Sequence, residues 1–302
     1  MRYNDKGDAV LTVQHQLLQR GYSLPKYGAD GHLGDETWGA LELYAKTEVG
    51  RSSWNPEVPE GVLERLGAAP VPPAPEPITP GPDAVVETLD LRHEQTDPAP
   101  KSKVINGKTV LRAPHTVTGI VLHQTACTYG VSQQQIQAAG GDRDLALHRR
   151  ALNVACHAMA FMDGCLVLTN EVESYIYHGN SFNSYTLGLE VEGRYPGLDN
   201  EPEKTTWGGD PTPLTEKTIT AAREGIRKLV EMGRDVGMPI TDIFAHRQSS
   251  ATRRSDPGEA LWRAVVLDYA VPVLGLVPHQ GVTLSDGMPV PKEWDPNGSG
   301  HY

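Results

Sequence analysis

A proline-rich segment divides this chain of 302 residues into two parts. Residues 69–82 read APVPPAPEPITPGP. Proline fixes φ and removes a backbone donor, so such a run favours extended, polyproline-like backbone over helix or sheet. We therefore predict a semi-rigid linker over residues 69–88, between a domain of residues 1–68 and a larger domain of residues 89–275. Residues 276–302 are expected to form a C-terminal tail.

The composition excludes several classes of protein. The formal net charge is −11, whereas a nucleic-acid-binding face needs clustered lysine and arginine, so no nucleic-acid partner is expected. Three cysteines at no disulfide-like spacing indicate reduced thiols. The first residues, MRYNDKGDAVL, lack the basic and apolar regions of a signal peptide, so we expect synthesis in the cytoplasm without one. The apolar run AVVLDYAVPVLGLVP is interrupted by Asp268 and Pro272 and is too short for a membrane anchor.

Helical periodicity dominates the first domain. Val10, Val13 and Leu17 recur at helical spacing. A second helix is expected to carry Trp38, and the sequence GVLERLG supplies a short third helix. Residues 1–68 are therefore predicted to form a small three-helix bundle.

The turn between the first two predicted helices carries a more specific pattern. The sequence DGHLG is followed by DETWGAL, which places Asp-Gly and a second glycine directly before a helix. Over residues 6–48 this pattern resembles the peptidoglycan-binding domain found at the ends of many cell-wall hydrolases. The resemblance implies that the first domain binds the cell wall. The alternative is a generic helical accessory domain in which Asp-Gly is only a turn.

The larger domain alternates between strand and helix patterns. Apolar runs in TGIVLHQTA and ITDIFAH each end in a histidine, as expected of buried strands that deliver a polar residue. HAMAFMDGCLVL contains a hairpin signal at Asp163-Gly164, and TLGLEVEG alternates so that Glu190 and Glu192 share one face. Residues 215–237 have the pattern of an amphipathic helix that ends at a glycine. The predicted fold class is therefore α/β, a mixed central β-sheet flanked by helices.

Two histidines and an aspartate are candidates for a metal site. His123 and His246 stand at the ends of predicted buried strands, and Asp256 follows His246 by ten positions, across the polar loop RQSSATRRS. Three nitrogen and oxygen ligands from separate elements, with a fourth position left for water, are typical of a catalytic zinc site. Because the chain has eleven histidines, their positions alone leave coincidence as an equal alternative.

Four motifs extend this pattern. GIVLHQTA, HAMAFMDG, YHGNSFNSYTLGLEVEG and AHRQSSATRRSDPG occur in an order and spacing similar to those of the zinc-dependent N-acetylmuramoyl-L-alanine amidases. This type-2 amidase family includes phage lysins and peptidoglycan-recognition proteins. The resemblance spans residues 118–262 and implies the type-2 amidase fold. It also implies that His123, His246 and Asp256 hold Zn²⁺ and that Glu190, in the motif GLE, is the general base.

The same resemblance assigns further residues. Arg254 stands where many members carry a lysine, two positions before the metal-binding aspartate, and it is expected to stabilise an oxyanion without donating a proton. His157 and His178 match pocket histidines and are expected to contact substrate; the alternative is that they pack inside the domain. Glu192 is expected to be a bystander, and a solvated strand-face position is the alternative for Glu190.

The resemblance as a whole implies an endolysin-like peptidoglycan hydrolase that cleaves the amide between N-acetylmuramic acid and L-alanine. The implied partner is bacterial peptidoglycan, reached at the cell wall or periplasm after release through a holin-like pore or delivery as a secretion-system effector. A monomer is expected. Two alternatives stay open: a non-catalytic peptidoglycan-recognition module on the same fold, and a cytosolic amidase that recycles muropeptides. Loss of a metal ligand would favour the first, and a soluble substrate would need no wall-binding domain.

Overall fold

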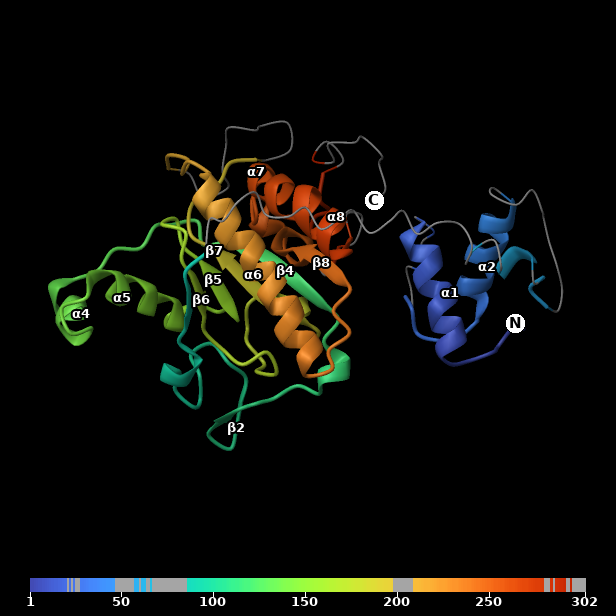
Figure 1. Ribbon diagram of the computed structural model, residues 1–302, viewed down its shortest axis with the longest axis horizontal. Helices are drawn as coiled ribbons and strands as arrows, with labels where there is room; N and C mark the ends of the chain where they lie inside the picture. Colours follow the sequence, from blue (N-terminus) through green and yellow to red (C-terminus); the bar gives the residue numbers. More distant parts are fainter. Residues whose placement is uncertain are drawn as a thin grey trace. The chain divides into compact units, whose positions relative to one another are not determined.

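The chain forms two compact units, which the computed structural model places at Met1–Glu76 and Pro77–Tyr302. Figure 1 shows the helical first unit and the mixed sheet of the second. The boundary falls inside the predicted linker, of which residues 69–85 lie outside the described residues. The structure describes residues 1–20, 22, 24, 28–46, 57–59, 61–63, 66, 86–197, 209–279, 283, 284, 286–291 and 294.

Two helices account for most of the described first unit, α1 (Asp8–Gln19) and α2 (Asp35–Tyr44). They share one apolar core, in which Val10 and Leu17 of α1 are buried with Leu41 of α2. The helical spacing predicted for the first segment is therefore confirmed. Part of the predicted third helix is also described, because residues 61–63 are helical, whereas residues 64, 65 and 67 lie outside the described residues.

The Asp-Gly turn before α2 is built around a buried glutamine. The Gln14 side-chain amide donates to Asp30 Oδ1 and to Thr37 Oγ1, both at 2.8 Å, and Gln14 Oε1 accepts from Gly31 N at 2.7 Å. Gly31 has φ +71°, a left-handed conformation that glycine adopts without a Cβ clash. A residue of α1 thus fixes the turn that leads into α2.

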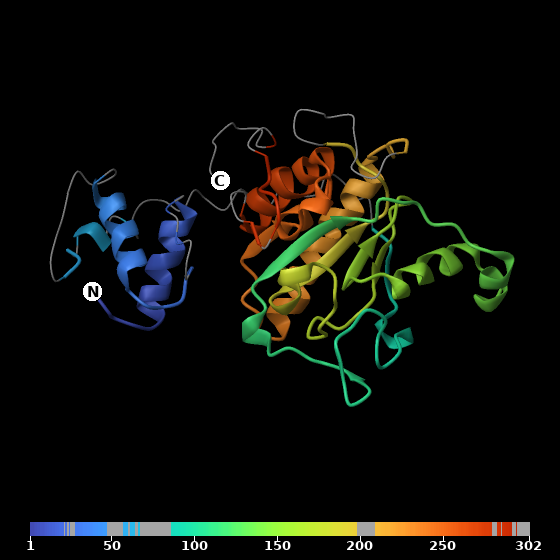
Figure 2. The same ribbon diagram turned by 180° about the vertical axis from the view of Figure 1, so that it is seen from behind.

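A seven-stranded sheet forms the centre of the second unit (Figures 1 and 2). The β5–β6 pair is antiparallel and forms the predicted hairpin, whereas the other neighbouring strands are parallel. The predicted mixed sheet is therefore confirmed. In spatial order the strands are β1 (Thr88–Asp90), β6 (Leu166–Leu168), β5 (Ala158–Ala160), β7 (Thr186–Val191), β4 (Gly119–Gln124), β8 (Asp242–Ala245) and β9 (Val277–Pro278). A separate hairpin consists of β2 (Val104–Ile105) and β3 (Lys108–Thr109).

Helical segments flank this sheet, as expected for the α/β class. Among the described residues, no helix is long and apolar enough to cross a bilayer. The α- and π-helical segments are α4 (Gln133–Ala138), α5 (Arg143–His148), α6 (Glu216–Asp235), α7 (Glu259–Trp262), the π-helical η8 (Arg263–Ala270) and α8 (Val271–Leu274). Short 3₁₀ helices are η2 (Arg92–Glu94), η3 (Pro114–Thr116), η4 (Arg149–Asn153), η5 (Asn180–Ser184), η6 (His246–Ser249) and η7 (Ala251–Arg253).

The longest helix, α6, packs along one face of the sheet. The Thr215 side chain caps its first turn, and Gly237, with φ +86°, follows its end. Ile226 lies in the same apolar core as Leu189 of β7. Gly225 permits this close approach, because a Cβ at that position would lie 2.7 Å from Leu189 Cδ1.

Strand alternation separates this core face from a polar face. Leu122 of β4 and Leu189 of β7 are buried in the core with α6. His123 and Glu190 are one position further along their strands, so they point to the opposite face. The two residues are also directly paired in the parallel register of β4 and β7. The sheet therefore places an imidazole and a carboxylate side by side on the face away from α6.

Residues beyond Gly275, expected as a tail, contribute to the second unit. Strand β9 extends the sheet beside β8. Leu276, Val290 and Trp294 are buried in the same core as α6. Residues 295–302 lie outside the described residues.

A buried histidine connects α5 to the β5–β6 hairpin. His148 Nε2 lies 2.9 Å from Asp163 Oδ2, and Asp163 Oδ1 accepts from Cys165 N at 2.9 Å. Burial lowers the pKa of His148, but hydrogen bonds with Asp163 and Cys165 outweigh burial and raise the pKa from 6.5 to about 10. The same hydrogen bond with His148 lowers the pKa of Asp163 below 3.8.

We expect this pair to stabilise the fold within a defined pH range. Because folding raises the pKa of His148, its contribution is complete below pH 6.5 and is lost as the pH rises through about 10. Because folding lowers the pKa of Asp163, its contribution is present above pH 3.8 and is lost in stronger acid. His148→Gln should therefore lose most stability between pH 3.8 and 6.5 and least above pH 10, as measured by urea unfolding. The assignment of this stabilisation to the His148–Asp163 pair is contradicted if the loss of stability is equal in acid and above pH 10. It is also contradicted if the exposed control His93→Gln shows the same loss.

Candidate functional site

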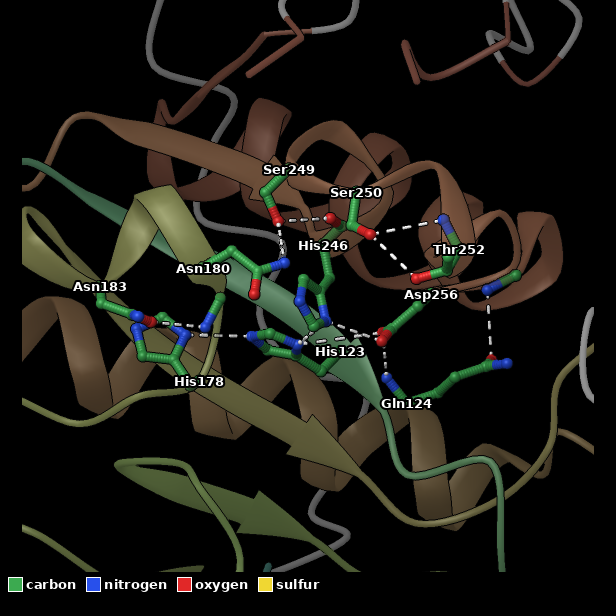
Figure 3. A network of polar contacts seen from close by, with 12 residues as sticks. His123, Gln124, His178, Asn180, Asn183, His246, Ser249, Ser250, Thr252 and Asp256 are labelled. Atoms are coloured by element: carbon green, nitrogen blue, oxygen red, sulfur yellow. Dashed lines mark hydrogen bonds and ion pairs between the residues drawn. The ribbon is translucent and has the colours of Figure 1, made fainter. Parts of the chain in front are cut away.

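Three buried side chains converge at the carboxyl end of the central strands (Figure 3). In the parallel pair of β4 and β8, Leu122 is paired with Ala245, so the next residue of each strand, His123 and His246, reaches the same place. Their Nδ1 atoms are 3.0 Å apart, and His246 Nδ1 lies 2.8 Å from Asp256 Oδ2. The possible ligand atoms of all three residues lie within 4.8 Å of one another. The convergence predicted from the sequence is therefore present.

The loop from His246 to Asp256 is closed by its own backbone and by a buried arginine. Arg247 N donates to Asp256 O at 2.8 Å, and Arg247 Nη1 donates to Arg254 O at 2.7 Å. Arg247 is fully buried, and its guanidinium lies 5.0 Å from the ring centre of Trp294. These contacts explain how a polar loop brings Asp256 back beside His246.

Gln124 is a positioning residue that the sequence reasoning missed. Its backbone N–H donates to Asp256 Oδ1 at 3.0 Å. Its side-chain Oε1 accepts from Gly258 N and from Tyr195 N, both at 3.2 Å. It thus holds the carboxylate and the backbone beyond it against the end of β4. The sequence signal for this role was the position of Gln124 directly after His123.

A chain of hydrogen bonds fixes which nitrogen of His123 faces the aspartate. His178 Nε2 lies 3.2 Å from the carbonyl oxygen of Thr186, which can only accept, so this nitrogen carries a proton. Burial lowers the pKa of His178 to about 3, so its ring is neutral and its Nδ1 accepts from His123 Nε2 at 3.1 Å. The lone pair of His123 Nδ1 therefore points toward His246 and Asp256 (Figure 3).

The cluster has the chemistry of a metal-binding site. Burial lowers the pKa of His123 well below 6.5, and the neighbouring His246 and His178 lower it further. A neutral imidazole offers the lone pair that coordinates a metal ion. Two imidazole nitrogens and one carboxylate oxygen suit a first-row divalent ion, and hard cations prefer more oxygens. His123, His246 and Asp256 are therefore able to hold a metal ion.

Glu190 supplies a second carboxylate on the same face. Its Oε2 is buried and has no hydrogen-bond partner among the described residues. Burial raises the pKa of Glu190 well above 4.5, Asp256 adds to the rise, and Arg253 opposes it. A buried acceptor without a protein partner is rare and indicates a group that serves a ligand or water.

The sequence of this unit matches a described family. Residues 113–259 match the family of N-acetylmuramoyl-L-alanine amidases. This domain belongs to that family. The matched range includes the three candidate ligands and Glu190. The comparison with curated proteins found no match.

Several solved structures are similar to this chain. N-acetylmuramoyl-L-alanine amidase LysC from Clostridium intestinale URNW is 15% identical, with a TM-score of 0.35, over 63% of this chain and 99% of that chain. The Ph2119 endolysin from the Thermus scotoductus MAT2119 bacteriophage is 16% identical, with a TM-score of 0.36, over 59% and 98%. Drosophila peptidoglycan recognition protein SD is 16% identical, with a TM-score of 0.35, over 59% and 91%. These likenesses are weak, and the family assignment rests on the sequence match.

Glu192 of the amidase domain does not share the environment of Glu190. Strand β7 ends at Val191, and the Glu192 side chain is buried, with Oε1 accepting from Tyr129 N at 2.7 Å and Oε2 from Met162 N at 3.1 Å. Leu189 and Val191 both lie in the core, which agrees with the expected common face of Glu190 and Glu192, although Glu192 stands one residue beyond the end of the strand. The Glu192 carboxylate connects two loops.

His157 and His178 of the amidase domain both lie beneath the site. His157 is fully buried, and its Nδ1 accepts from Gly188 N at 3.0 Å while its Nε2 lies 3.1 Å from Ser174 O. Both ring nitrogens of His178 are likewise occupied, one by His123 and one by a carbonyl. These contacts agree with the alternative in which the two rings pack inside the domain, and the expected substrate contact stays a prediction.

Two neighbouring arginines differ in their relation to the site. Arg254 is half-buried, and its carbonyl accepts from Arg247. The exposed Arg253 is the arginine whose charge acts on both His123 and Glu190. The positive charge expected from Arg254 thus has a second source one residue earlier.

We predict that His178 sets the metal affinity of the amidase domain through His123. His178→Phe removes the acceptor for His123 Nε2–H, so binding of a divalent ion should weaken by about 10- to 100-fold. His178→Gln keeps a carbonyl acceptor and should recover part of the loss. The measurement is titration with Co²⁺, followed by its visible absorption, with thermal unfolding as a check on the fold. The exposed His115→Gln is the matched control. If folded His178→Phe binds Co²⁺ as the wild type does, His178 does not position the ligand.

Proposed function

We propose that this chain is a zinc-dependent N-acetylmuramoyl-L-alanine amidase that hydrolyses the bond between N-acetylmuramic acid and L-alanine in bacterial peptidoglycan. The observation that carries the proposal is the convergence of His123, His246 and Asp256 inside a domain of the amidase family. Two imidazoles and one carboxylate, with room for a further ligand, are a donor set of catalytic zinc sites. When bound, Zn²⁺ makes water a nucleophile near neutral pH and polarises an amide carbonyl.

The residues around this cluster have separate roles in the proposed reaction. Glu190 accepts the proton of the attacking water and returns it to the leaving amine. Its partnerless, buried Oε2 on the same sheet face as His123 supports this role. Arg254, together with Arg253, supplies positive charge for the oxyanion; a guanidinium stabilises charge but does not donate a proton.

The two alternative functions fit the observations less well. A non-catalytic recognition module would be favoured by loss of a ligand, whereas all three ligand candidates are present and converge. A muropeptide-recycling amidase acts on soluble substrate and has no need of a wall-binding unit. The first unit supports wall binding, because beside its Asp-Gly turn lies a cavity of about 640 Å³ lined in part by Tyr3, Asp30, His32 and Asp35.

We further propose that the first unit anchors the enzyme to the wall and that the proline-rich linker raises the local concentration of substrate. This arrangement suits an endolysin-like monomer made in the cytoplasm that acts at the cell wall. Release through a holin-like pore and delivery by a secretion system are both compatible with it.

The first prediction of this proposal tests Glu190 as the general base. Glu190→Gln preserves shape but cannot accept the proton, so turnover should fall by about 10²- to 10⁴-fold, while zinc content and muropeptide affinity change little. Turnover is measured by mass spectrometry of stem peptides released from purified sacculi. Glu216→Gln, an exposed glutamate at the start of α6, is the control and should be neutral. Glu192→Gln is unsuitable as a control because its carboxylate is buried and hydrogen-bonded. Wild-type turnover in Glu190→Gln would assign the base to another residue.

The second prediction concerns the first unit. Removing residues 1–82 should leave a folded amidase, because the boundary between the two compact units lies inside the proline-rich linker. Without the anchor, hydrolysis of intact sacculi should fall by roughly tenfold or more, whereas hydrolysis of small soluble muropeptides should be retained. The ratio of the two rates is the measurement. An equal fall on both substrates indicates that the first unit supports the fold of the second, and no fall on either indicates that anchoring contributes nothing.

A further inference from the structure

The hairpin of β2 and β3 stands apart from the central sheet of the second unit. Figures 1 and 2 both show it projecting from the body of that unit. Its two-residue turn consists of Asn106 and Gly107, with φ of +52° and +76°. Left-handed values at both positions are those of the tight turn that matches the twist of paired strands. The tip is therefore a fixed, convex feature.

Exposed apolar side chains collect on and beside this hairpin. Five large hydrophobic side chains are exposed in the described part of the second unit; two of them, Val104 and Ile105, lie on the hairpin, and Leu111 and Tyr177 lie beside it. The relative exposures are 47% for Val104, 55% for Ile105, 66% for Leu111 and 52% for Tyr177. Tyr177 belongs to the patch because its N–H donates to the carbonyl of Lys101 at 2.8 Å. A concentration of this kind marks an interaction surface more often than single exposed residues do.

The segment that carries the hairpin is basic, whereas the neighbouring segment that pairs with it carries Glu171 and Glu173. The chain has 38 acidic residues and a net charge of −11, yet residues 98–141 contain no aspartate or glutamate. Lys108 lies on the hairpin, and Lys101 and Lys103 precede its first strand, with Lys103 Nζ 5.1 Å from the ring centre of Tyr175. The nearest acidic side chain before it, Asp97, accepts from Thr109 N at the base. We call Val104, Ile105, Leu111, Tyr177 and the three lysines the hairpin patch.

A convex patch of this composition suits a lipid surface. A protein partner would have to offer a hollow for the tip, whereas the headgroup layer of a membrane adapts to any shape. Aliphatic side chains gain by leaving water for the boundary between headgroups and acyl chains. Lysines beside them keep their stems in that boundary and their charges at the lipid phosphates. Because the turn is already ordered, little conformational entropy is lost on binding.

We propose that the hairpin patch binds membrane surfaces rich in anionic lipid, with Val104 and Ile105 entering the headgroup layer and the lysines contacting phosphate. The proposal is independent of the amidase activity. The second unit would then have a binding surface besides the candidate site. No residue of this surface takes part in the proposed hydrolysis.

Sedimentation of the full chain with vesicles tests this proposal. Vesicles of phosphatidylglycerol and phosphatidylcholine should bind the wild type, and vesicles of phosphatidylcholine alone should bind it much less. Added salt should weaken the binding. Lys103→Gln with Lys108→Gln should lower affinity by about 25-fold, since each lysine near an anionic surface strengthens binding by roughly fivefold. Val104→Ser with Ile105→Ser should lower it by on the order of tenfold, because two side chains no longer leave water.

The matched control is Val236→Ser, an exposed aliphatic side chain of the same unit that lies outside the patch. It should bind as the wild type does, and all variants should keep the wild-type unfolding temperature and their hydrolysis of soluble muropeptides. The proposal is overturned if the wild type fails to bind anionic vesicles, or if Val104→Ser with Ile105→Ser binds them undiminished. Soluble poly-glutamate distinguishes lipid binding from plain charge attraction to any polyanion. The proposal is also overturned if poly-glutamate displaces the protein completely and Val104→Ser with Ile105→Ser still binds the vesicles undiminished.

Discussion

The parallel pairing of β4 with β8 is the interaction on which the candidate site depends. It brings His123 and His246 to the same end of the sheet, so that two imidazoles meet although 123 positions separate them. Asp256 completes the group from the loop after His246, and the backbone of Gln124, at the end of β4, donates to its carboxylate. The site is thus a property of one sheet edge, where carboxyl ends of neighbouring parallel strands gather polar residues.

A buried polar layer beneath the site makes this arrangement rigid. The Arg112 guanidinium is buried and donates to the carbonyls of Asn183 and Val172. Burial lowers its pKa to about 10, which still leaves it charged near neutral pH. The motif glycine Gly188 belongs to the same layer, because a Cβ there would lie 2.8 Å from the ring of His178. Such networks are costly when one partner is removed, since the remaining groups stay buried without a partner.

The sequence was informative where a local pattern decides the outcome. The period of α6 and the two apolar runs ending in histidine are local signals, and the structure agrees with each. The predicted linker, in contrast, extends too far, because its last residue, Thr88, already belongs to β1. The sequence was silent where long-range contacts decide. Nothing in GLEVEG indicates the partners of Glu192, because they are backbone groups at Tyr129 and Met162. The inward position of His157 likewise depends on Gly188 and Ser174, which no periodicity reveals.

The packing of Trp294 against Arg247 has a consequence for the order of events during synthesis. Arg247 holds the loop that carries Asp256, and its guanidinium rests on a side chain almost fifty positions later in the chain. Strand β9 must also join β8 after it. While these late residues are still inside the ribosome, the loop lacks its support. The candidate site of a nascent chain is therefore complete only after Trp294 has emerged.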